Sequence, residues 1–266
     1  MKEHSMAPLR ERDVTRHIAR EYYKEFDQLI ESDVIIVGAG PSGLLCAHDL
    51  ASQGIRTLLI EQSLALGGGF WSGGYLMNKA TICSPADNIL TELGIPCKPV
   101  KECDGMTIVD PPHATARLIS AAYEAGAKVM NLTRVLDLIV REEGKLEGVV
   151  VNNTTAEMAG HDIIHVDPIA LESRIVVDAT GHDAVVVNLL HQRNLYEKVP
   201  GNGAMWIAKS EALVVENTRE VYPHCFVTGL AVAAVDGSPR MGPAFGSMIL
   251  SGRRAADLVK QKLKGE

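Results

Sequence analysis

The chain has 266 residues, of which 46% are hydrophobic, and it carries a formal net charge of -7 with both signs interspersed. This composition is ample for the core of a globular α/β protein, and it offers no basic surface for nucleic acid. No apolar run has the length of a membrane span, and the polar start of the sequence differs from a signal peptide. We therefore expect a cytoplasmic protein with neither a nucleic acid nor a membrane as partner.

An amphipathic leader helix is predicted over residues 13 to 31. Its apolar side chains recur every fourth position, at Val14, Ile18, Tyr22, Phe26 and Ile30. The helix leads directly into the first predicted strand. A leader helix of this kind often packs on a neighbour.

Residues 33 to 43 read Asp-Val-Ile-Ile-Val-Gly-Ala-Gly-Pro-Ser-Gly, a buried strand that runs into a G-x-G-x-x-G motif. In a dinucleotide-binding fold, Gly38 makes the tight turn, Gly40 lets the backbone approach a pyrophosphate, and Gly43 allows helix–strand packing. The helix that continues over residues 44 to 53 would place its N-terminus against that pyrophosphate.

Glu61 closes the second predicted strand, residues 56 to 60. A carboxylate there can accept hydrogen bonds from both hydroxyls of an adenosine ribose and disfavours a 2′-phosphate, so we expect NAD or FAD rather than NADP. A glycine-rich stretch follows, in which Gly69 could contact the dinucleotide. A flexible loop is the alternative interpretation of that stretch.

The later elements complete the expected fold. Helices are predicted from Ser84-Pro85 to Gly94, from Asp110 to Gly126 and from about 245 to 262. Residues 134 to 141 and 146 to 152 form a predicted hairpin, and residues 174 to 178 and 225 to 228 form further strands. We expect one domain over residues 1 to 266, a Rossmann-like FAD/NAD-binding (glutathione-reductase-like) three-layer α/β fold, with an inserted β segment at about 134 to 170.

Three histidines and three aspartates fall close together in the middle of the chain, as His161-Asp162, His165-Val166-Asp167-Pro168 and His182-Asp183. Histidine and carboxylate suit iron(II) and related divalent metals, particularly in sites with open coordination positions. His182 follows a buried strand, where α/β folds place ligand-binding residues. Solvated loop residues, with His182 and Asp183 capping the next helix, are an equally good interpretation of the spacing.

Arg240 lies between turn residues ahead of the last helix. Arginine can bind a carboxylate through two parallel hydrogen bonds, so Arg240 is a candidate anchor for a small acid, although a surface arginine is at least as common. Flavoproteins of the glutathione-reductase class share the first glycine motif and the Ala179-Thr180-Gly181 turn. They carry a flavin-binding Gly-Asp at a late strand end, where this chain has Gly229-Leu230.

Taken together, these residues resemble the thiamine thiazole synthases of the eukaryotic and archaeal type, from about Val14 to Ala256. The matching motifs are Gly38-Ala39-Gly40-Pro41-Ser42-Gly43, Glu61-Gln62, Gly67-Gly68-Gly69, Glu157-Met158-Ala159-Gly160, His165-Val166-Asp167-Pro168, Thr180-Gly181-His182-Asp183 and Arg240-Met241-Gly242-Pro243. In that family NAD is consumed: nicotinamide leaves, and the ADP-ribose moiety combines with glycine and sulfur to give an ADP-linked thiazole carboxylate.

The resemblance implies a role for each matching position. The dinucleotide would be held by Ser42, Glu61, Gln62, Gly69, Val135 and Leu230, with His165, Val166 and Asp167 reaching the nucleotide of a neighbouring subunit. Asp167 and His182 would bind iron(II), the former across the subunit interface, and Arg240 would hold the glycine carboxylate. Because family members assemble as ring-like octamers, we expect a homo-octamer with shared sites.

Position 165 departs from part of the family. Fungal and plant members carry a cysteine there and sacrifice its sulfur in a single turnover, whereas this chain has His165, which has no sulfur to give. The chain therefore resembles the archaeal and anaerobic-bacterial subgroup, which uses free sulfide and turns over repeatedly; His165, Asp167 and His182 are then the expected catalytic residues. An insertion at residues 161 to 164 and a short stretch after Asp183 leave the local loop geometry open.

Two other functions remain open from the sequence. An FAD-dependent oxidoreductase is favoured by the fold and opposed by Gly229-Leu230. A non-catalytic sensor of NAD or ADP-ribose would need neither the metal-binding residues nor Arg240.

Overall fold

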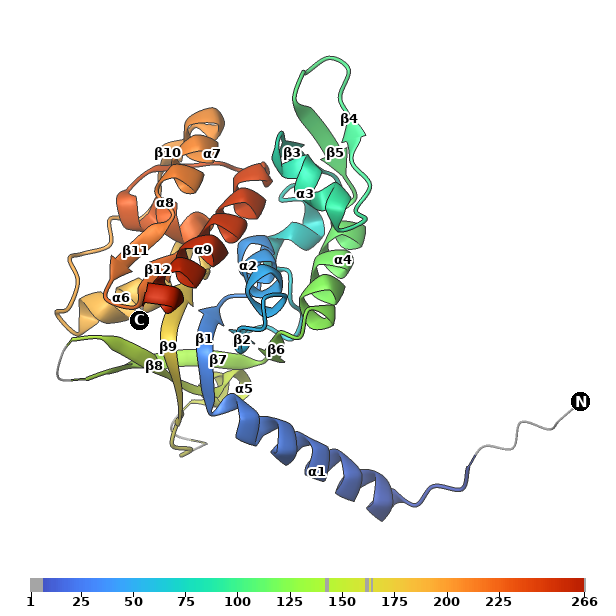
Figure 1. Ribbon diagram of the computed structural model, residues 1–266, viewed down its shortest axis with the longest axis vertical. Coiled ribbons are helices and arrows are strands. Elements are labelled where there is room, and N and C mark those ends of the chain that lie inside the picture. The colour runs from blue at the N-terminus through green and yellow to red at the C-terminus, as the bar shows by residue number, and fades with distance from the viewer. Residues whose placement is uncertain (1–6, 142–143, 161–162, 164, 266) are drawn as a thin grey trace, which may run out of the picture.

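The computed structural model describes residues 7–141, 144–160, 163 and 165–265. Its centre is an eight-stranded sheet in which six strands follow the order β11-β12-β9-β1-β2-β6 (Figure 1). These strands are β11 (Arg219–Tyr222), β12 (Cys225–Val227), β9 (Ile169–Asp178), β1 (Glu31–Val37), β2 (Thr57–Ile60) and β6 (Lys128–Met130). All neighbouring pairs among them are parallel except β11 and β12.

The predicted hairpin is present as β7 (Thr133–Val140) and β8 (Leu146–Asn153), which pair antiparallel. β8 also pairs with the first half of β9, while the second half of β9 pairs with β12. The long strand β9 therefore joins the inserted β segment to the parallel sheet. The segment also contains a short helix, α5 (Thr154–Ala159), which the sequence pattern did not predict. A helix of six residues is too short to show a periodicity, and Asn153 begins it by accepting a hydrogen bond from the Thr155 amide.

Alternate residues of the central strands point into two separate cores, as a sheet covered on both faces requires. Val34 and Ile36 of β1 belong to the core under α2 (Pro41–Ala51), α4 (Pro111–Glu124) and α9 (Gly246–Gly265). Ile35 and Val37 belong to the core formed with the β7–β8 hairpin, α6 (Val185–Gln192) and α8 (Leu230–Asp236). This arrangement confirms the predicted three-layer α/β fold.

Helices lie on both sides of the sheet. Those of the first core are α2 (Pro41–Ala51), α3 (Ala86–Glu92), α4 (Pro111–Glu124) and α9 (Gly246–Gly265). The second core includes α6 (Val185–Gln192) and α8 (Leu230–Asp236), and α7 (Ile207–Glu216) packs beside α8 and α9. The short 3₁₀ turns η1 (Gly68–Ser72) and η2 (Gly181–Asp183) follow β2 and β9. In the described part of the chain, no helix is both long and apolar enough to cross a bilayer.

Two small sheets, neither of them predicted, complete the structure. β3 (Ala80–Cys83), β5 (Met106–Val109) and β4 (Lys98–Pro99) form one, and β10 (Gly203–Met205) with β13 (Pro239–Arg240) forms the other. Their strands have four residues or fewer, too few to show alternation. The β10–β13 pair carries Arg240, the candidate anchor for a small acid.

Two predicted helix caps are wrong in detail, although both helices form. The Ser84 hydroxyl donates to the Asp87 carboxylate and does not cap the backbone of α3. Asp110 precedes α4 without capping it, because its carboxylate pairs with Lys79. In both cases another side chain competes for the polar group that would have capped the helix.

The leader helix α1 (Glu11–Leu29) leads into β1, as predicted, and projects from the body of the molecule (Figure 1). Leu29 is its buried residue. On its apolar face Ile18 is 66% exposed and Tyr22 is 59% exposed. Among the described residues of this chain, no other helix or strand covers this face.

Candidate active site

A cavity of about 880 Å³ opens where β1, β2 and β9 end. Its size lies within the usual range for ligand pockets, about 300–1,000 Å³. Parallel α/β sheets bind ligands at this carboxyl edge. Ten of the residues predicted for the site line it: Gly38, Gly40, Ser42, Glu61, Gln62, Gly69, Val135, His182, Leu230 and Arg240.

The glycine motif has the geometry that the sequence predicted. Gly38 has a φ of +101°, and a side chain there would come within 2.5 Å of the Ala179 carbonyl oxygen. Gly43 does not line the cavity, because it packs α2 against the turn: a Cβ at this position would lie 2.0 Å from the Gly38 oxygen. Gly40 lines the cavity, and a Cβ there would meet no protein atom within 4 Å. The space beside Gly40 is thus free for a ligand.

Glu61 lies just beyond the end of β2 and is 8% exposed. Its Oε2 accepts a hydrogen bond of 2.9 Å from the Ala39 amide, and its Oε1 accepts one of 2.8 Å from the Ser63 amide. An ionised carboxylate has about four acceptor sites, so two remain. The backbone bonds hold the carboxylate at the cavity wall with acceptors left for a ligand.

The turn after β9 is held by a buried carboxylate, Asp178. This side chain accepts hydrogen bonds from the amide and hydroxyl of Thr180 and from the amides of Val186 and Val187 at the start of α6. Burial raises the pKa of Asp178, and these hydrogen bonds oppose the rise. Neither His182 nor Asp183 caps α6 through its side chain, so the capping suggested for them is wrong, although both are exposed. Asp178 and Thr180 accept hydrogen bonds from the first amides of α6 instead.

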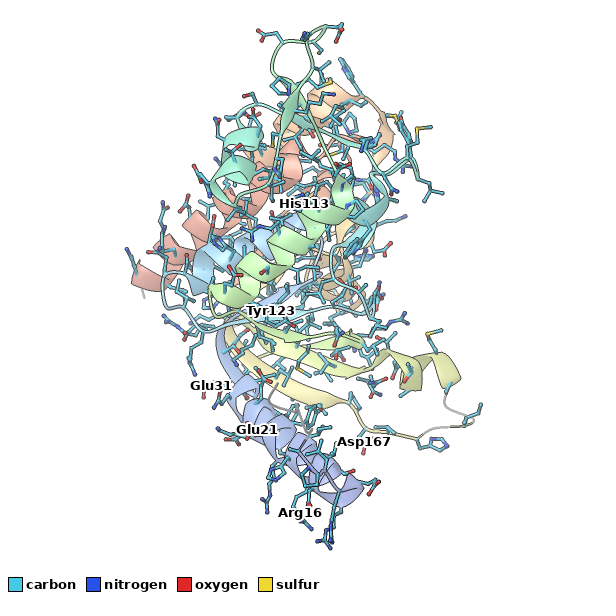
Figure 2. The ribbon with its side chains drawn as sticks, turned by 90° about the vertical axis from the view of Figure 1, so that its right-hand side faces the viewer. Arg16, Glu21, Glu31, His113, Tyr123 and Asp167 are labelled. Carbon is cyan, nitrogen blue, oxygen red and sulfur yellow. The ribbon has the colours of Figure 1, made fainter. Side chains whose placement is uncertain are left out.

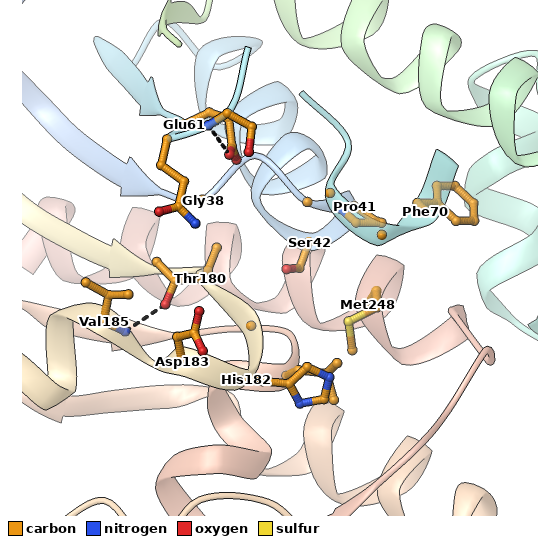
Figure 3. A pocket seen from close by; sticks show the side chains of 18 of the residues that line it. Gly38, Pro41, Ser42, Glu61, Phe70, Thr180, His182, Asp183, Val185 and Met248 are labelled. Atoms are coloured by element: carbon orange, nitrogen blue, oxygen red, sulfur yellow. Dashed lines mark hydrogen bonds between the residues drawn. The ribbon is translucent and has the colours of Figure 1, made fainter. Parts of the chain in front are cut away.

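His182 lies in η2, and its imidazole faces the cavity (Figure 3). The Nδ1 atom lies 2.5 Å from Oδ1 of Asn202. Figure 3 shows His182 well apart from Glu61, with Ser42 between them in that view. A ligand that spans the cavity can therefore contact Glu61 with one end and His182 with the other.

Arg240 reaches the cavity from β13. Its backbone carbonyl accepts a hydrogen bond from the Trp206 amide, which fixes this short strand beside the start of α7. Among the described residues no carboxylate forms an ion pair with its guanidinium. The cavity therefore combines a carboxylate, an imidazole and an available guanidinium.

His165, Val166 and Asp167 do not line this cavity. All three are exposed on the segment before β9, and Figure 2 shows Asp167 at the end of the molecule where α1 lies. Within the part of the chain that the structure describes, no three His, Cys, Asp or Glu side chains are grouped to hold a metal ion. A single chain thus does not bring Asp167 to His182. His161 and Asp162 of the predicted cluster lie outside the described residues.

The sequence did not indicate several other residues of the cavity wall. These are Thr133, Arg134, Met205, Phe245 and Met248 among others. Asn202 was also missed, and it lies behind His182. Isolated residues of this kind carry no spacing signal, because the fold brings them together from separate elements.

The chain is similar to known proteins over most of its length. The model of the Thi4 family matches residues 15–245. A protein from Aeropyrum pernix named thiamine thiazole synthase is 49% identical over 97% of this chain and 94% of its own length. One from Pyrococcus horikoshii with the same name is 42% identical over 96% of this chain and 99% of its own length.

Among solved structures, the crystal structure of Thermovibrio ammonificans THI4 superposes with a TM-score of 0.92 at 35% identity, covering 97% of this chain and 100% of that one. A geranylgeranyl bacteriochlorophyll reductase-like protein from Thermoplasma acidophilum has a TM-score of 0.55 at 15% identity, over 88% of this chain and 79% of that one, which shows a shared fold alone. The family match spans most of the chain, and the named relatives align over nearly all of it. The chain therefore belongs to the Thi4 family, the enzyme family of the thiamine thiazole synthases.

Proposed function

We propose that this protein is an iron(II)-dependent thiazole synthase of thiamine biosynthesis. It converts NAD, glycine and free sulfide to an ADP-thiazole carboxylate, releases nicotinamide and acts in the cytoplasm. The observation that carries the proposal is one cavity that combines the glycine motif and Glu61 with His182 and Arg240, in a chain of the Thi4 family.

The Glu61 side of the cavity suits the adenosine half of NAD. Glu61 retains acceptors for the ribose hydroxyls, and Gln62 and Val135 line the wall beside it. Ser42 lies in the first turn of α2, where backbone amides favour a pyrophosphate. This placement leaves the nicotinamide end of NAD for the side of the cavity where His182 lies.

Arg240 suits the glycine carboxylate. A guanidinium offers two parallel donors to a carboxylate, and this one lines the cavity together with His182. Holding glycine there would bring its amino group to the part of NAD that reacts after nicotinamide leaves.

His182 fits a metal site, because its Nδ1 is already hydrogen-bonded to Asn202 and its Nε2 is left for a ligand. Asp167 of the partner subunit would supply the second protein ligand, since Asp167 is exposed and distant from the cavity of its own chain. Iron(II) would supply Lewis-acid chemistry and bring sulfide beside the glycine-derived group.

Free sulfide is favoured as the sulfur source for two reasons. His165 occupies the position of the sulfur-donor cysteine of other family members. In addition, all five cysteines lie in the described part of the chain, and none of them lines the cavity. Burial raises the pKa of the Cys46 and Cys225 thiols, which makes them poor nucleophiles at neutral pH.

A metal site shared between two chains requires that the chains assemble, and we propose that they form the homo-octamer of the family. Two exposed features agree with a subunit interface: the apolar face of α1, and the segment from His165 to Ile169, in which Val166 is 52% exposed. An assembly that covers this segment would deliver His165, Val166 and Asp167 to the neighbouring nucleotide.

The test is an omission series under anaerobic conditions. Protein with iron(II), NAD, glycine and sulfide should release nicotinamide and form an ADP-thiazole, and omission of glycine or sulfide should remove the thiazole. Mass spectrometry of the small molecule that co-purifies with the protein provides an independent result. Bound NAD, a glycine adduct or a thiazole would support the proposal, whereas bound FAD, or NAD that is never cleaved, would contradict it.

A further inference from the structure

The side chain of Asn202 contacts His182, the candidate metal ligand, although Asn202 is not part of the cavity wall. Its Oδ1 lies 2.5 Å from Nδ1 of His182, although the two residues are 20 positions apart in the sequence. Asn202 does not itself line the cavity, and its Nδ2 is buried without a hydrogen-bond partner among the described residues. The His182 imidazole thus separates Asn202 from the cavity.

The backbone holds Asn202 on both sides. The Gly201 amide donates to the Ala234 carbonyl of α8 at 3.0 Å, and the Gly203 amide donates to the Ser238 carbonyl at 2.8 Å. Gly203 begins β10, which pairs with β13, the strand that carries Arg240. The backbone of Asn202 is therefore held in place, next to the same small sheet that carries the proposed glycine anchor.

This contact selects one form of the imidazole. A carbonyl oxygen only accepts hydrogen bonds, so Nδ1 of His182 must carry the proton, and the lone pair of the neutral ring is then on Nε2. If the side-chain amide of Asn202 were rotated by 180°, its Nδ2 would donate to Nδ1 of His182, and the ring proton would then be on Nε2. That form could not bind a metal through Nε2.

We infer that Asn202 is a positioning residue that keeps His182 in the Nδ1–H form, with Nε2 available to a divalent metal in the cavity. Outer hydrogen-bond partners commonly set the tautomer and orientation of metal-binding histidines. The role of iron(II) rests on the proposed function, whereas the tautomer is a property of the metal-free protein. The two can therefore be tested separately.

The first experiment is solid-state ¹⁵N NMR of metal-free, histidine-labelled protein, with His182→Gln to identify the His182 signals. Asn202→Asp keeps only acceptors at this place and should preserve the Nδ1–H form. Asn202→Leu removes the acceptor and should remove the preference. Asn188→Leu is the matched control, since it removes a side-chain amide that donates a hydrogen bond to the Asp183 carbonyl of the same turn; it should leave the His182 signals in the Nδ1–H form.

The second experiment is an anaerobic titration of the same variants with iron(II), and with NAD as the control ligand. Asn202→Leu should weaken iron(II) binding about 10–100-fold, the usual cost of losing such a partner, while Asn202→Asp restores it and NAD binding stays unchanged. An Nε2–H form in the unmodified protein, or an Asn202→Leu variant with unaltered tautomer and iron affinity, would overturn the inference. Intact metal binding without thiazole formation would instead contradict the proposed function alone.

Discussion

The carboxylate of Glu61 accepts a hydrogen bond from the backbone amide of Ala39, inside the glycine motif, at 2.9 Å. Ala39 is fully buried between Gly38 and Gly40. The acidic residue beyond β2 and the turn after β1 are therefore one unit, so that Glu61 both shapes the turn and contributes to the cavity wall.

Replacing Glu61 with Gln should weaken NAD binding about tenfold or more, because a hydrogen bond to a charged group contributes about 1.5–3 kcal/mol. The variant should also discriminate less against NADP, since the carboxylate no longer repels a 2′-phosphate. Isothermal titration with both dinucleotides measures the two effects. Glu102→Gln, on an exposed loop, is the control and should bind like the parent protein. Unchanged NAD affinity in Glu61→Gln would remove Glu61 from the site.

Replacing Arg240 with Lys should raise the KM for glycine about tenfold or more, because an ammonium cannot form the two parallel bonds of a guanidinium. The dissociation constant for NAD should stay the same, since Glu61 lies elsewhere on the cavity wall. Steady-state kinetics with varied glycine, together with NAD titration, separates the two substrates. A loss of NAD affinity with an unchanged KM for glycine would assign Arg240 to the nucleotide instead.

The shared metal site can be tested by mixing subunits. Asp167→Ala and His182→Ala should each be inactive. If the two residues come from different chains, refolding an equal mixture should restore about one quarter of the sites, because one quarter of the interfaces combine an intact Asp167 with an intact His182. Activity and iron content of the mixed oligomer measure this recovery. Mixtures that stay inactive would contradict a metal site shared between two chains.

Because Glu211 of α7 is partly buried, we expect the free energy of unfolding to depend on pH, independently of catalysis. Its carboxylate accepts hydrogen bonds from the amide and hydroxyl of Ser247, and burial raises its pKa above the ordinary value of 4.5. Between that value and the raised one, the folded protein binds more protons than the unfolded chain, so this group lowers stability as the pH rises.

The Glu211→Gln variant should lose this slope. The difference in unfolding free energy between Glu211→Gln and the parent should therefore shift in favour of the variant as the pH rises from about 4.5 towards neutrality. Urea unfolding at several pH values measures it. Glu216→Gln, an exposed position on the same helix, is the control. A difference that is independent of pH would contradict the effect of burial.

The sequence predicted the parts of the fold that have a local signal. The buried strand before Gly38, the hairpin over β7 and β8 and the long last helix all have a clear period, and all three formed. The strands of the small sheets are too short for such a signal. The caps at Ser84 and Asp110 failed because Asp87 and Lys79 compete for the same polar groups.

The candidate site was predictable where a motif marked it and not elsewhere. Glu61 and the glycine motif follow from spacing, whereas Asn202 reaches His182 only through the packing of β10 against β13. Asp167 shows another limit, because in the proposed assembly its expected partner His182 would belong to a different subunit. The pattern of one chain does not describe a contact between two.

The number of thiazole molecules formed per chain tests the central claim most directly. Anaerobic protein supplied with iron(II), NAD, glycine and excess sulfide should form several equivalents of ADP-thiazole and of nicotinamide, and the mass of the chain should not change. At most one product per chain, with a cysteine that has lost its sulfur, would contradict the claim that sulfide is the sulfur source.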